Sequence, residues 1–350
     1  MKGITALFFI SCLSIFQSSA AQSKSPGCID VFYSRASDPF ISSFDDSLKA
    51  QSLPLGQKVR SFDAQGHEDV QMQQYLSVSS DKCMKIIDLS NPLYSQSLVS
   101  YAREQGQKIV FFNRKPDAGA MISYDKVWYV GSNPIEIGEA QGKMVVNYVV
   151  THPEYDRNNN SRLDIILLKG PFSDYISEFR VQRMIKELKK ARIKFERVAT
   201  INADWSFESS FEQILEYIKK NGLDNVDVII SNNDSMALGA LQALQMNGYN
   251  IGQGYSKIPI FGIDSIPEAL TAIHKCLLEG SVSHDYRTMA KICLAISIKP
   301  DIKSETISKL FNFPVNDNYI LVPSNLNAVN KANCRMKKIL KIIEFLHFLS

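Results

Sequence analysis

The sequence predicts an α/β fold built on parallel β-sheets. Short apolar runs rich in β-branched residues alternate with amphipathic segments of helical length along most of the chain. Such alternation usually produces parallel strands joined by right-handed helical crossovers. At 350 residues the chain is long enough for two lobes with separate cores. The formal net charge of +3 favours no particular class of partner and does not indicate a nucleic-acid-binding protein.

The expected elements follow one another in a regular order. Strands are expected at 29–33, 84–89, 108–113, 164–168, 226–231 and 258–264. Helices are expected at 40–51, 93–105, 136–150, 174–192, 207–221, 234–247, 266–278 and 285–297. Most strands end in polar residues or glycine: Asn113, Lys169-Gly170, Asn232-Asn233-Asp234 and Asp264. Because ligands of open α/β sheets bind beyond the carboxyl ends of the strands, we expect these residues to line one crevice.

The first twenty residues have the features of a secretory signal peptide. Lys2 gives a basic start, an apolar run extends from Ile4 to Phe16, and small residues follow up to Ala21. The run is too short to span a membrane convincingly. Residues 1–20 are therefore expected to be removed on export, and lipidation of Cys12 is the less favoured alternative.

Export to an oxidising compartment changes how the cysteines are interpreted. Without Cys12, an odd number remain and none forms a CxxC pair: Cys28, Cys83, Cys276, Cys293 and Cys334. Metal thiolate sites are therefore not expected, whereas one or two disulfides are. The spacing leaves their connectivity open.

Residues 156–164 have the spacing of a loop that wraps one hard cation. Oxygen-bearing side chains stand at loop positions 1, 3, 5 and 9, namely Asp156, Asn158, Asn160 and Asp164. Position 7, which contributes a backbone carbonyl, is Arg162, and Ser161 replaces the usual glycine at position 6. The alternative is a solvated turn between a helix and a strand.

No catalytic motif stands out, and we do not expect an enzyme. There is no nucleophile elbow, phosphate loop or HExxH sequence. Instead the chain carries groups that suit a neutral polyol, because sugar hydroxyls both donate and accept while sugar C–H faces pack on aromatic rings. Candidates for the polar contacts are Asp38, Asn113, Arg180, Asn233 and Asp264, and candidates for the aromatic faces are Phe40 and Trp205. Either aromatic also fits a core position.

From about Lys108 to Ala290 the chain resembles the periplasmic galactose/glucose-binding proteins of bacterial sugar uptake and chemotaxis. The segments that carry the resemblance are Ile-Val-Phe-Phe-Asn113, Ser-Tyr-Asp-Lys-Val-Trp-Tyr-Val-Gly131, Leu-Leu-Lys-Gly170, Ile-Lys-Glu-Leu188, Ser-Asn-Asn233-Asp-Ser-Met-Ala-Leu-Gly239 and Pro-Ile-Phe-Gly-Ile-Asp264-Ser-Ile-Pro-Glu-Ala-Leu270. Before Lys108 the likeness rests mainly on the first strand and the Asp38-Pro-Phe40 turn, and it fades after Ala290.

The resemblance implies the fold of a type I periplasmic binding protein, with two Rossmann-like lobes joined by a three-segment hinge. The N-terminal lobe is expected to take residues 28–132 plus 284–318. The C-terminal lobe is expected to take 133–283 plus 319–334. A basic, apolar helical tail at 335–350 is expected to pack on the body of the protein, with membrane-surface contact as the alternative.

The resemblance also implies residue roles. Asp38, Phe40, Asn113, Arg180, Trp205, Asn233 and Asp264 match sugar-contacting positions of the family. Asp156, Asn158, Asn160, Arg162 and Asp164 match its calcium ligands. The final bidentate ligand of the family, a glutamate, falls on Asp227, which is shorter by one methylene.

Three positions depart from the family pattern. Asp174 replaces a histidine, Ile176 replaces an acidic hydrogen-bond partner, and His284 replaces an asparagine. Each lost hydrogen bond to a sugar hydroxyl costs about 0.5–1.5 kcal/mol. The resemblance therefore predicts a small polar ligand, with galactose or glucose as the first candidates.

The resemblance predicts a monomeric exported protein that presents a sugar to a membrane ABC permease, a chemoreceptor, or both. Two rivals remain. One is a periplasmic sensory protein for a different small ligand that is not coupled to transport. The other is an exported enzyme on the same fold, for which Asp174 and His284 would be the novel polar groups. A repressor of this fold is disfavoured because a signal peptide stands where a DNA-binding headpiece would be.

Overall fold

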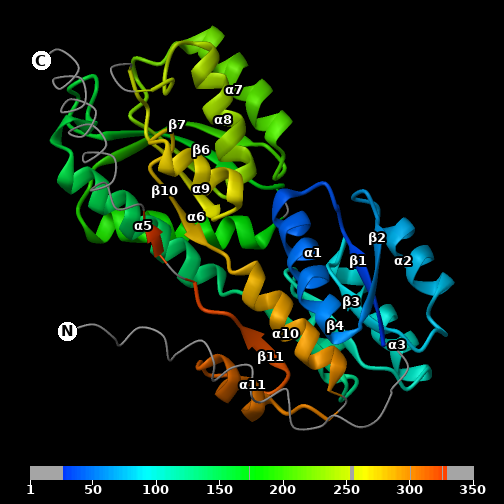
Figure 1. The fold of residues 1–350 in the computed structure, drawn as a ribbon. Coiled ribbons are helices and arrows are strands. Elements are labelled where there is room, and N and C mark those ends of the chain that lie inside the picture. The colour runs from blue at the N-terminus through cyan, green and yellow to red at the C-terminus, as the bar shows by residue number, and fades with distance from the viewer. Residues whose placement is uncertain (1–26, 173, 253–255, 300, 325, 329–350) are drawn as a thin grey trace, which may run out of the picture.

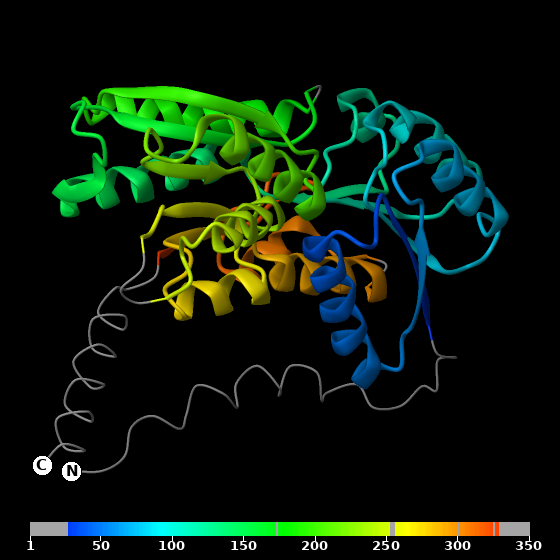
Figure 2. The same cartoon turned by 90° about the horizontal axis from the view of Figure 1, so that it is seen from above.

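The computed structural model describes residues 27–328 with the exception of 173, 253–255, 300 and 325. This part of the chain forms two α/β lobes, each with a six-stranded sheet (Figures 1 and 2). The predicted signal peptide, Cys334 and the predicted tail at 335–350 lie outside the described residues.

The sheet of the N-terminal lobe is parallel throughout. Its strands in spatial order are β11 (Tyr319–Leu321), β5 (Val127–Gly131), β4 (Ile109–Phe112), β3 (Met84–Ile87), β1 (Cys28–Tyr33) and β2 (Lys58–Asp63). The inner strands are buried on both faces, which explains their near-continuous apolar composition.

The sheet of the C-terminal lobe is parallel except at one edge. Its strands in spatial order are β12 (Leu326–Ala328), β10 (Gly280–Ser283), β9 (Ile260–Asp264), β8 (Val228–Ser231), β6 (Leu163–Lys169) and β7 (Phe195–Asn202). Only the pairing of β12 with β10 is antiparallel among these described strands.

Helices cover both faces of each sheet. They are α1 (Pro39–Ser52), α2 (Glu68–Ser77), α3 (Ser95–Glu104), α4 (Ala118–Ile122), α5 (Pro134–Thr151), α6 (Tyr175–Lys190), α7 (Phe207–Asn221), α8 (Asp234–Met246), α9 (Pro267–His274), α10 (Tyr286–Ile298) and α11 (Ser304–Phe311). Single 3₁₀ turns lie at Leu53–Leu55, Pro92–Tyr94 and Pro153–Tyr155. The six expected strands and eight expected helices are confirmed, with ends shifted by a few residues.

The chain crosses between the lobes three times, as predicted. The crossings join β5 to α5, β10 to α10, and β11 to β12. After the second crossing α10 returns to the N-terminal lobe and packs against α1 (Figure 1). The assignment of 319–334 to the C-terminal lobe is wrong for Tyr319–Leu321, because β11 pairs with β5 and buries Ile320 in the N-terminal lobe. Leu326–Ala328 does join the C-terminal sheet.

A disulfide joins the amino ends of two strands in the N-terminal lobe. Cys28 at the start of β1 is bonded to Cys83, which precedes β3. Cys276 is also disulfide-bonded, and Cys293 is a free, buried thiol on α10. The expectation of one or two disulfides is therefore confirmed.

A buried ion-pair network lies beside this disulfide. Lys85 on β3 is completely buried, and its Nζ lies 2.6 Å from Asp30 Oδ2 on β1 and 2.7 Å from the carbonyl of Val78. Arg60 on β2 bridges Asp30 and Asp81 at 2.6 and 2.7 Å. Asp30, Asp81 and Cys83 form the single compact group of acidic, cysteine or histidine side chains with metal-like spacing among the described residues. The disulfide and the two cations occupy that group, so it is structural.

Candidate ligand-binding cleft

A cavity of about 60 Å³ lies between the lobes, beyond the carboxyl ends of their strands. The residues that line it include all nine predicted ligand contacts: Asp38, Phe40, Asn113, Asp174, Arg180, Trp205, Asn233, Asp264 and His284. We call this space the cleft cavity. Small-molecule sites usually measure about 300–1,000 Å³, so the lobes have to separate before a sugar can enter.

The first turn of α1 supplies one wall of the cleft cavity. Asp38 is the N-cap of this helix, and its Oδ1 accepts hydrogen bonds from the backbone N–H groups of Phe40 at 2.8 Å and Ile41 at 3.5 Å. Burial, followed by the nearby Asp264 carboxylate, raises the pKa of Asp38 to about 7. The Asp38 carboxyl can therefore either donate to or accept from a ligand hydroxyl near neutral pH.

Asn113 is held in one orientation by a buried carboxylate. Its Nδ2 donates to Asp88 Oδ1 at 3.0 Å, and Asp88 Oδ2 accepts from the backbone N–H and the hydroxyl of Ser34. Because this bond fixes the amide, Asn113 Oδ1 remains as an acceptor for a ligand. Burial raises the pKa of Asp88, although Arg114 and the hydrogen bonds oppose the shift.

Arg180 supplies the principal buried cation of the cleft cavity. Only 6% of it is exposed, and its Nη1 donates to the carbonyl of Asn232 at 2.8 Å. Its guanidinium carbon lies 5.8 Å from the centre of the Trp205 ring. Its Nε has no hydrogen-bond partner among the described residues. A buried donor without a partner is costly, so a ligand acceptor at this position would be favoured.

Trp205 lies against the end of β6 because the facing residue is a glycine. A Cβ at Gly170 would lie 2.2 Å from the indole, so no other residue fits without moving the ring. Asn233 fixes the same loop, since its Nδ2 donates to the Trp205 carbonyl at 3.2 Å and its Oδ1 caps α8 through Met236 N. The two hydrogen bonds of Asn233 thus hold the Trp205 loop against the start of α8.

His284 joins the two lobes at the second crossing. Its ring stacks on Phe40 with centroids 4.2 Å apart, and its Nδ1 lies 3.3 Å from Asp264 Oδ1. Burial lowers the pKa of His284, although Asp264 opposes the shift, and this favours the neutral ring at neutral pH. The face of Phe40 that touches His284 is closed to a sugar ring in this arrangement.

Three residues that line the cleft cavity have left-handed or otherwise uncommon backbone conformations. Asn113, Trp205 and Asp264 have positive φ angles of 60°, 63° and 116°. Residues with a Cβ pay about 1–3 kcal/mol for such conformations, which cluster at functional sites. These conformations set the directions in which the three side chains leave the backbone at the cavity.

The three departures from the family pattern all lie at the cleft cavity. Asp174 Oδ1 caps α6 by accepting from Ile176 N at 2.8 Å and Ser177 N at 3.3 Å. Ile176 offers the cavity an apolar side chain. Sequence reasoning missed Ser34, Ile41 and Arg114, which also line it. Asp88 follows β3, so the polar-strand-end signal that identified Asn113 could have identified it as well.

The loop at 156–164 has the backbone of a cation-binding loop but a different pattern of donors. Ser161, at the position usually held by glycine, has a φ of 64°. Asn158 Nδ2 and Asn160 Nδ2 donate to Asp164 Oδ2 at 2.9 and 2.7 Å, and Arg162 Nε donates to Asp164 Oδ1 at 2.9 Å. Both oxygens of Asp227 accept backbone N–H groups, from Arg157 and from Asp164, at 2.8 Å.

As they lie, these residues do not fit a calcium ion. Calcium needs converging oxygens, whereas three N–H donors converge on the Asp164 carboxylate. The amides cannot simply be reversed, because Asn158 Oδ1 accepts from Asn160 N and Asn160 Oδ1 accepts from Arg162 N.

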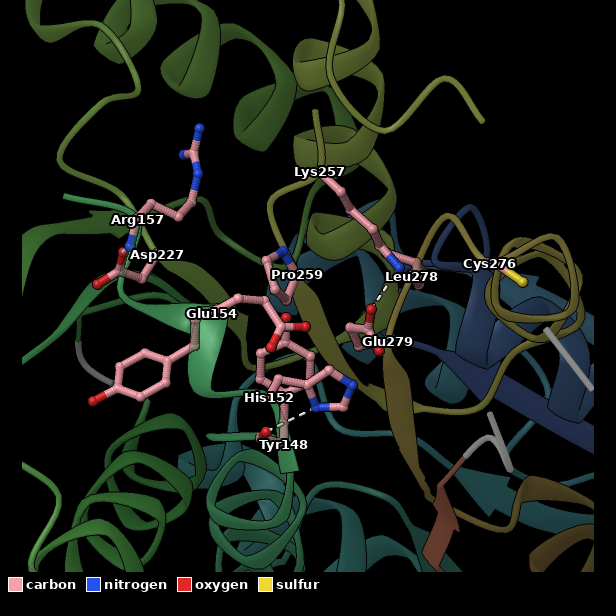
Figure 3. Close-up of a pocket in the computed structure, with 11 residues that line it drawn as sticks. Tyr148, His152, Glu154, Arg157, Asp227, Lys257, Pro259, Cys276, Leu278 and Glu279 are labelled. Atoms are coloured by element: carbon pink, nitrogen blue, oxygen red, sulfur yellow. Dashed lines mark hydrogen bonds and ion pairs between the residues drawn. The ribbon is translucent and has the colours of Figure 1, made fainter. Parts of the chain in front are cut away.

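A larger cavity of about 290 Å³ lies at the other end of the C-terminal sheet (Figure 3). Its lining residues Asp227, Pro259 and Glu279 directly precede β8, β9 and β10. Lys257 pairs with Glu279 at 2.5 Å, and His152 lies 2.9 Å from the Tyr148 carbonyl (Figure 3). Ligands of parallel sheets bind at the opposite, carboxyl ends of the strands, so this cavity is not the candidate site.

Two parallel-sheet lobes, three crossings and a polar, aromatic cavity between the lobes define a two-lobed ligand-binding protein. No described helix is long and apolar enough to cross a membrane. The family model of the periplasmic binding protein domain matches residues 29–299, and the chain belongs to this family.

Comparison with known proteins supports the same class. The chain is 29% identical to the D-galactose/methyl-galactoside binding periplasmic protein of Haemophilus influenzae, over 85% of this chain and 88% of that protein. An ABC-transporter solute-binding protein of Actinobacillus succinogenes, solved with D-allose, has a TM-score of 0.69 at 16% identity and covers 88% of this chain and 99% of its own. A Bacillus halodurans solute-binding protein, solved with myo-inositol, has a TM-score of 0.68 at 19% identity, and the match covers 89% of this chain and 97% of that protein.

Proposed function

We propose that this chain is an exported solute-binding protein that captures a small sugar in the cleft cavity, with galactose and glucose as the first candidates. Residues 1–20 direct it to the periplasm and are removed there. It presents the bound sugar to a membrane ABC permease, a chemoreceptor, or both. Its task is binding and release, without chemical change of the ligand.

The observation that carries this proposal is the set of groups that meet in one cavity. Arg180 offers a donor, Asn113 offers an acceptor, and Asp38 and Asp264 add carboxyl groups. Trp205 and Phe40 add aromatic surface. This combination suits a ligand whose hydroxyls donate and accept around an apolar ring face.

The position of these groups on both lobes explains how binding is signalled. Asp38 and Asn113 belong to the N-terminal lobe, whereas Arg180, Trp205 and Asp264 belong to the C-terminal lobe. A ligand that contacts both sets stabilises the closed arrangement over an open one. A membrane partner can then distinguish the loaded protein by its shape.

The test is a titration of the mature protein with D-galactose, D-glucose, ribose and xylose, followed by tryptophan fluorescence. Trp205 lines the cleft cavity, whereas Trp128 is buried in the N-terminal sheet. We expect a saturable change with a hexose that persists in Trp128→Phe and disappears in Trp205→Phe. Isothermal calorimetry on the same samples provides a readout that does not depend on tryptophan. Folded protein that gives no response to any of the four sugars by either method would refute this assignment.

A further inference from the structure

A second cavity, of about 180 Å³, adjoins the cleft cavity. The two share Asn113, Ile176, Arg180 and His284 as lining residues. Its other walls include residues 132–135 of the first crossing and Tyr319 on β11, the strand that precedes the third crossing. We call this space the side chamber. It lies between the cleft cavity and the hinge, so a ligand could extend from one space into the other.

The walls of the side chamber are mainly aromatic and aliphatic. Tyr129 and Tyr319 come from the N-terminal lobe, and Tyr175 and Phe179 come from the first turns of α6. Tyr175 and Phe179 are 42% and 40% exposed and lie edge to face with centroids 6.1 Å apart. Exposed aromatic side chains beside a cavity are typical of ligand-binding surfaces.

Two residues that line the side chamber each have a buried polar atom without a hydrogen-bond partner among the described residues. Ser132 Oγ and Arg180 Nε are both buried, and neither makes a hydrogen bond to another described residue. Buried polar groups are nearly always satisfied in native proteins, so a ligand oxygen that reached these atoms would be favoured.

The apolar side chain of Ile176 favours a substituted sugar over a free one. It stands on the wall shared by the two spaces, where the resemblance predicts an acidic hydrogen-bond partner for a sugar hydroxyl. An apolar residue there does not satisfy a free hydroxyl, but it tolerates a substituent attached through that oxygen.

We propose that the side chamber binds the aglycone of a glycoside, so that the natural ligand is a sugar carrying an apolar or aromatic substituent. This inference rests on the proposed function and narrows its ligand class. The sugar ring occupies the cleft cavity, the glycosidic oxygen lies near Arg180, and the substituent packs against Tyr175 and Phe179.

The experiment compares free hexoses with their p-nitrophenyl α- and β-glycosides by isothermal calorimetry, using galactose and glucose. We expect one nitrophenyl glycoside to bind about tenfold or more tightly than its free sugar, because an aromatic ring gains apolar burial and stacking. The double variant Tyr175→Ala/Phe179→Ala removes this gain and leaves binding of the free sugar within about twofold. Tyr101→Ala, a similarly exposed tyrosine on α3, is the matched control and retains the gain.

The outcomes separate the two proposals. Equal affinities for free sugars and glycosides overturn the side-chamber proposal and leave the sugar-binding assignment intact. A double variant that weakens both ligands equally also overturns it. Failure of both free sugars and glycosides to bind overturns the sugar-binding assignment itself.

The loop at 156–164 contains an arginine that pairs with its most buried carboxylate. Arg162 is 42% exposed at its side chain, pairs with the fully buried Asp164, and also contacts Glu196. Its guanidinium therefore supplies positive charge to the carboxylate that a bound cation would otherwise neutralise. We infer that this loop is held in its cation-binding shape by Arg162 and does not require calcium.

The test measures bound calcium by equilibrium dialysis and thermal melting in excess EGTA and in millimolar calcium. We expect no stoichiometric calcium in the natural protein and melting temperatures that agree within about 1 °C. Arg162→Gln leaves Asp156, Asp164 and Asp227 without that countercharge. We therefore expect the variant to have a lower melting temperature than the natural protein in EGTA, and calcium to raise it. Arg103→Gln on α3 is the control and shows neither effect. Stoichiometric calcium on the natural protein, or a large loss of stability in EGTA, would overturn the inference.

Discussion

Replacing Arg180 with methionine is expected to weaken sugar binding by about 100-fold or more. The guanidinium is a buried cation on the wall of the cleft cavity, and its Nε has no hydrogen-bond partner among the described residues. Hydrogen bonds to charged groups are worth about 1.5–3 kcal/mol each, so losing two such bonds reaches this range. Methionine keeps an unbranched, flexible side chain in the same space, which limits the loss of packing.

Arg183→Met provides the control on the same helix. Arg183 lies one turn further along α6, is partly exposed, and pairs with Glu139 at 3.5 Å. A partly exposed pair of this kind contributes about 0–1 kcal/mol, so binding should change by less than about twofold. Calorimetry measures affinity, and thermal melting shows that both variants are folded. An Arg180→Met protein that is folded and binds as tightly as the natural one would exclude Arg180 from the site.

Much of the cleft could be predicted from the sequence because its chemistry lies at strand ends. Asn113 and Asp264 directly follow or end apolar runs, and the α/β pattern places such positions at one edge of the sheet. Asp38, Phe40 and Trp205 could be proposed only from the chemistry of their side chains, with support from the family resemblance, because a loop or helix-start residue carries no periodicity that points to a cavity. The structure brings all of them together.

Other features depend on contacts that no local pattern encodes. Polar and apolar residues alternate only weakly along β7, which is largely exposed, and β2 is a partly exposed edge strand. Neither strand therefore has the buried apolar run by which the other strands were predicted. The assignment of Tyr319 to the wrong lobe arose because a three-residue strand can extend either sheet, and only its pairing with β5 decides. The side chamber could not be predicted from the sequence either, since Ser132, Tyr175 and Tyr319 are far apart along the chain and come together only in the folded protein.

The loop at 156–164 keeps the residue spacing of a cation-binding loop, although its side chains make different contacts. The oxygen positions predict a cation, and the left-handed Ser161 confirms the turn that such loops need. Arg162 was expected to contribute only its carbonyl. Its side chain instead turns to Asp164, which is an outcome that depends on rotamer choice and on Glu196 from the neighbouring strand.

Replacing Lys85 with methionine is expected to lower the free energy of unfolding by about 3 kcal/mol. Removing one partner of a buried ion pair costs about 3–5 kcal/mol, since the other charge stays buried without compensation. Here Lys85 and Asp30 are both fully buried, and Lys85 also satisfies the Val78 carbonyl. We place the loss at the lower end because Arg60 continues to pair with Asp30. Urea unfolding of the mature protein, with the disulfide intact, measures the change.

Two further variants show whether the buried charge is the cause. Lys82 lies three residues earlier and its side chain is exposed. Lys82→Met changes the net charge by the same amount as Lys85→Met, and it should change the free energy of unfolding by less than about 0.5 kcal/mol. Asp30→Asn combined with Lys85→Met removes both buried charges, so it should be more stable than Lys85→Met alone. If Lys85→Met were as stable as Lys82→Met, the network would be dispensable and the disulfide would be the main restraint on the amino ends of β1 and β3.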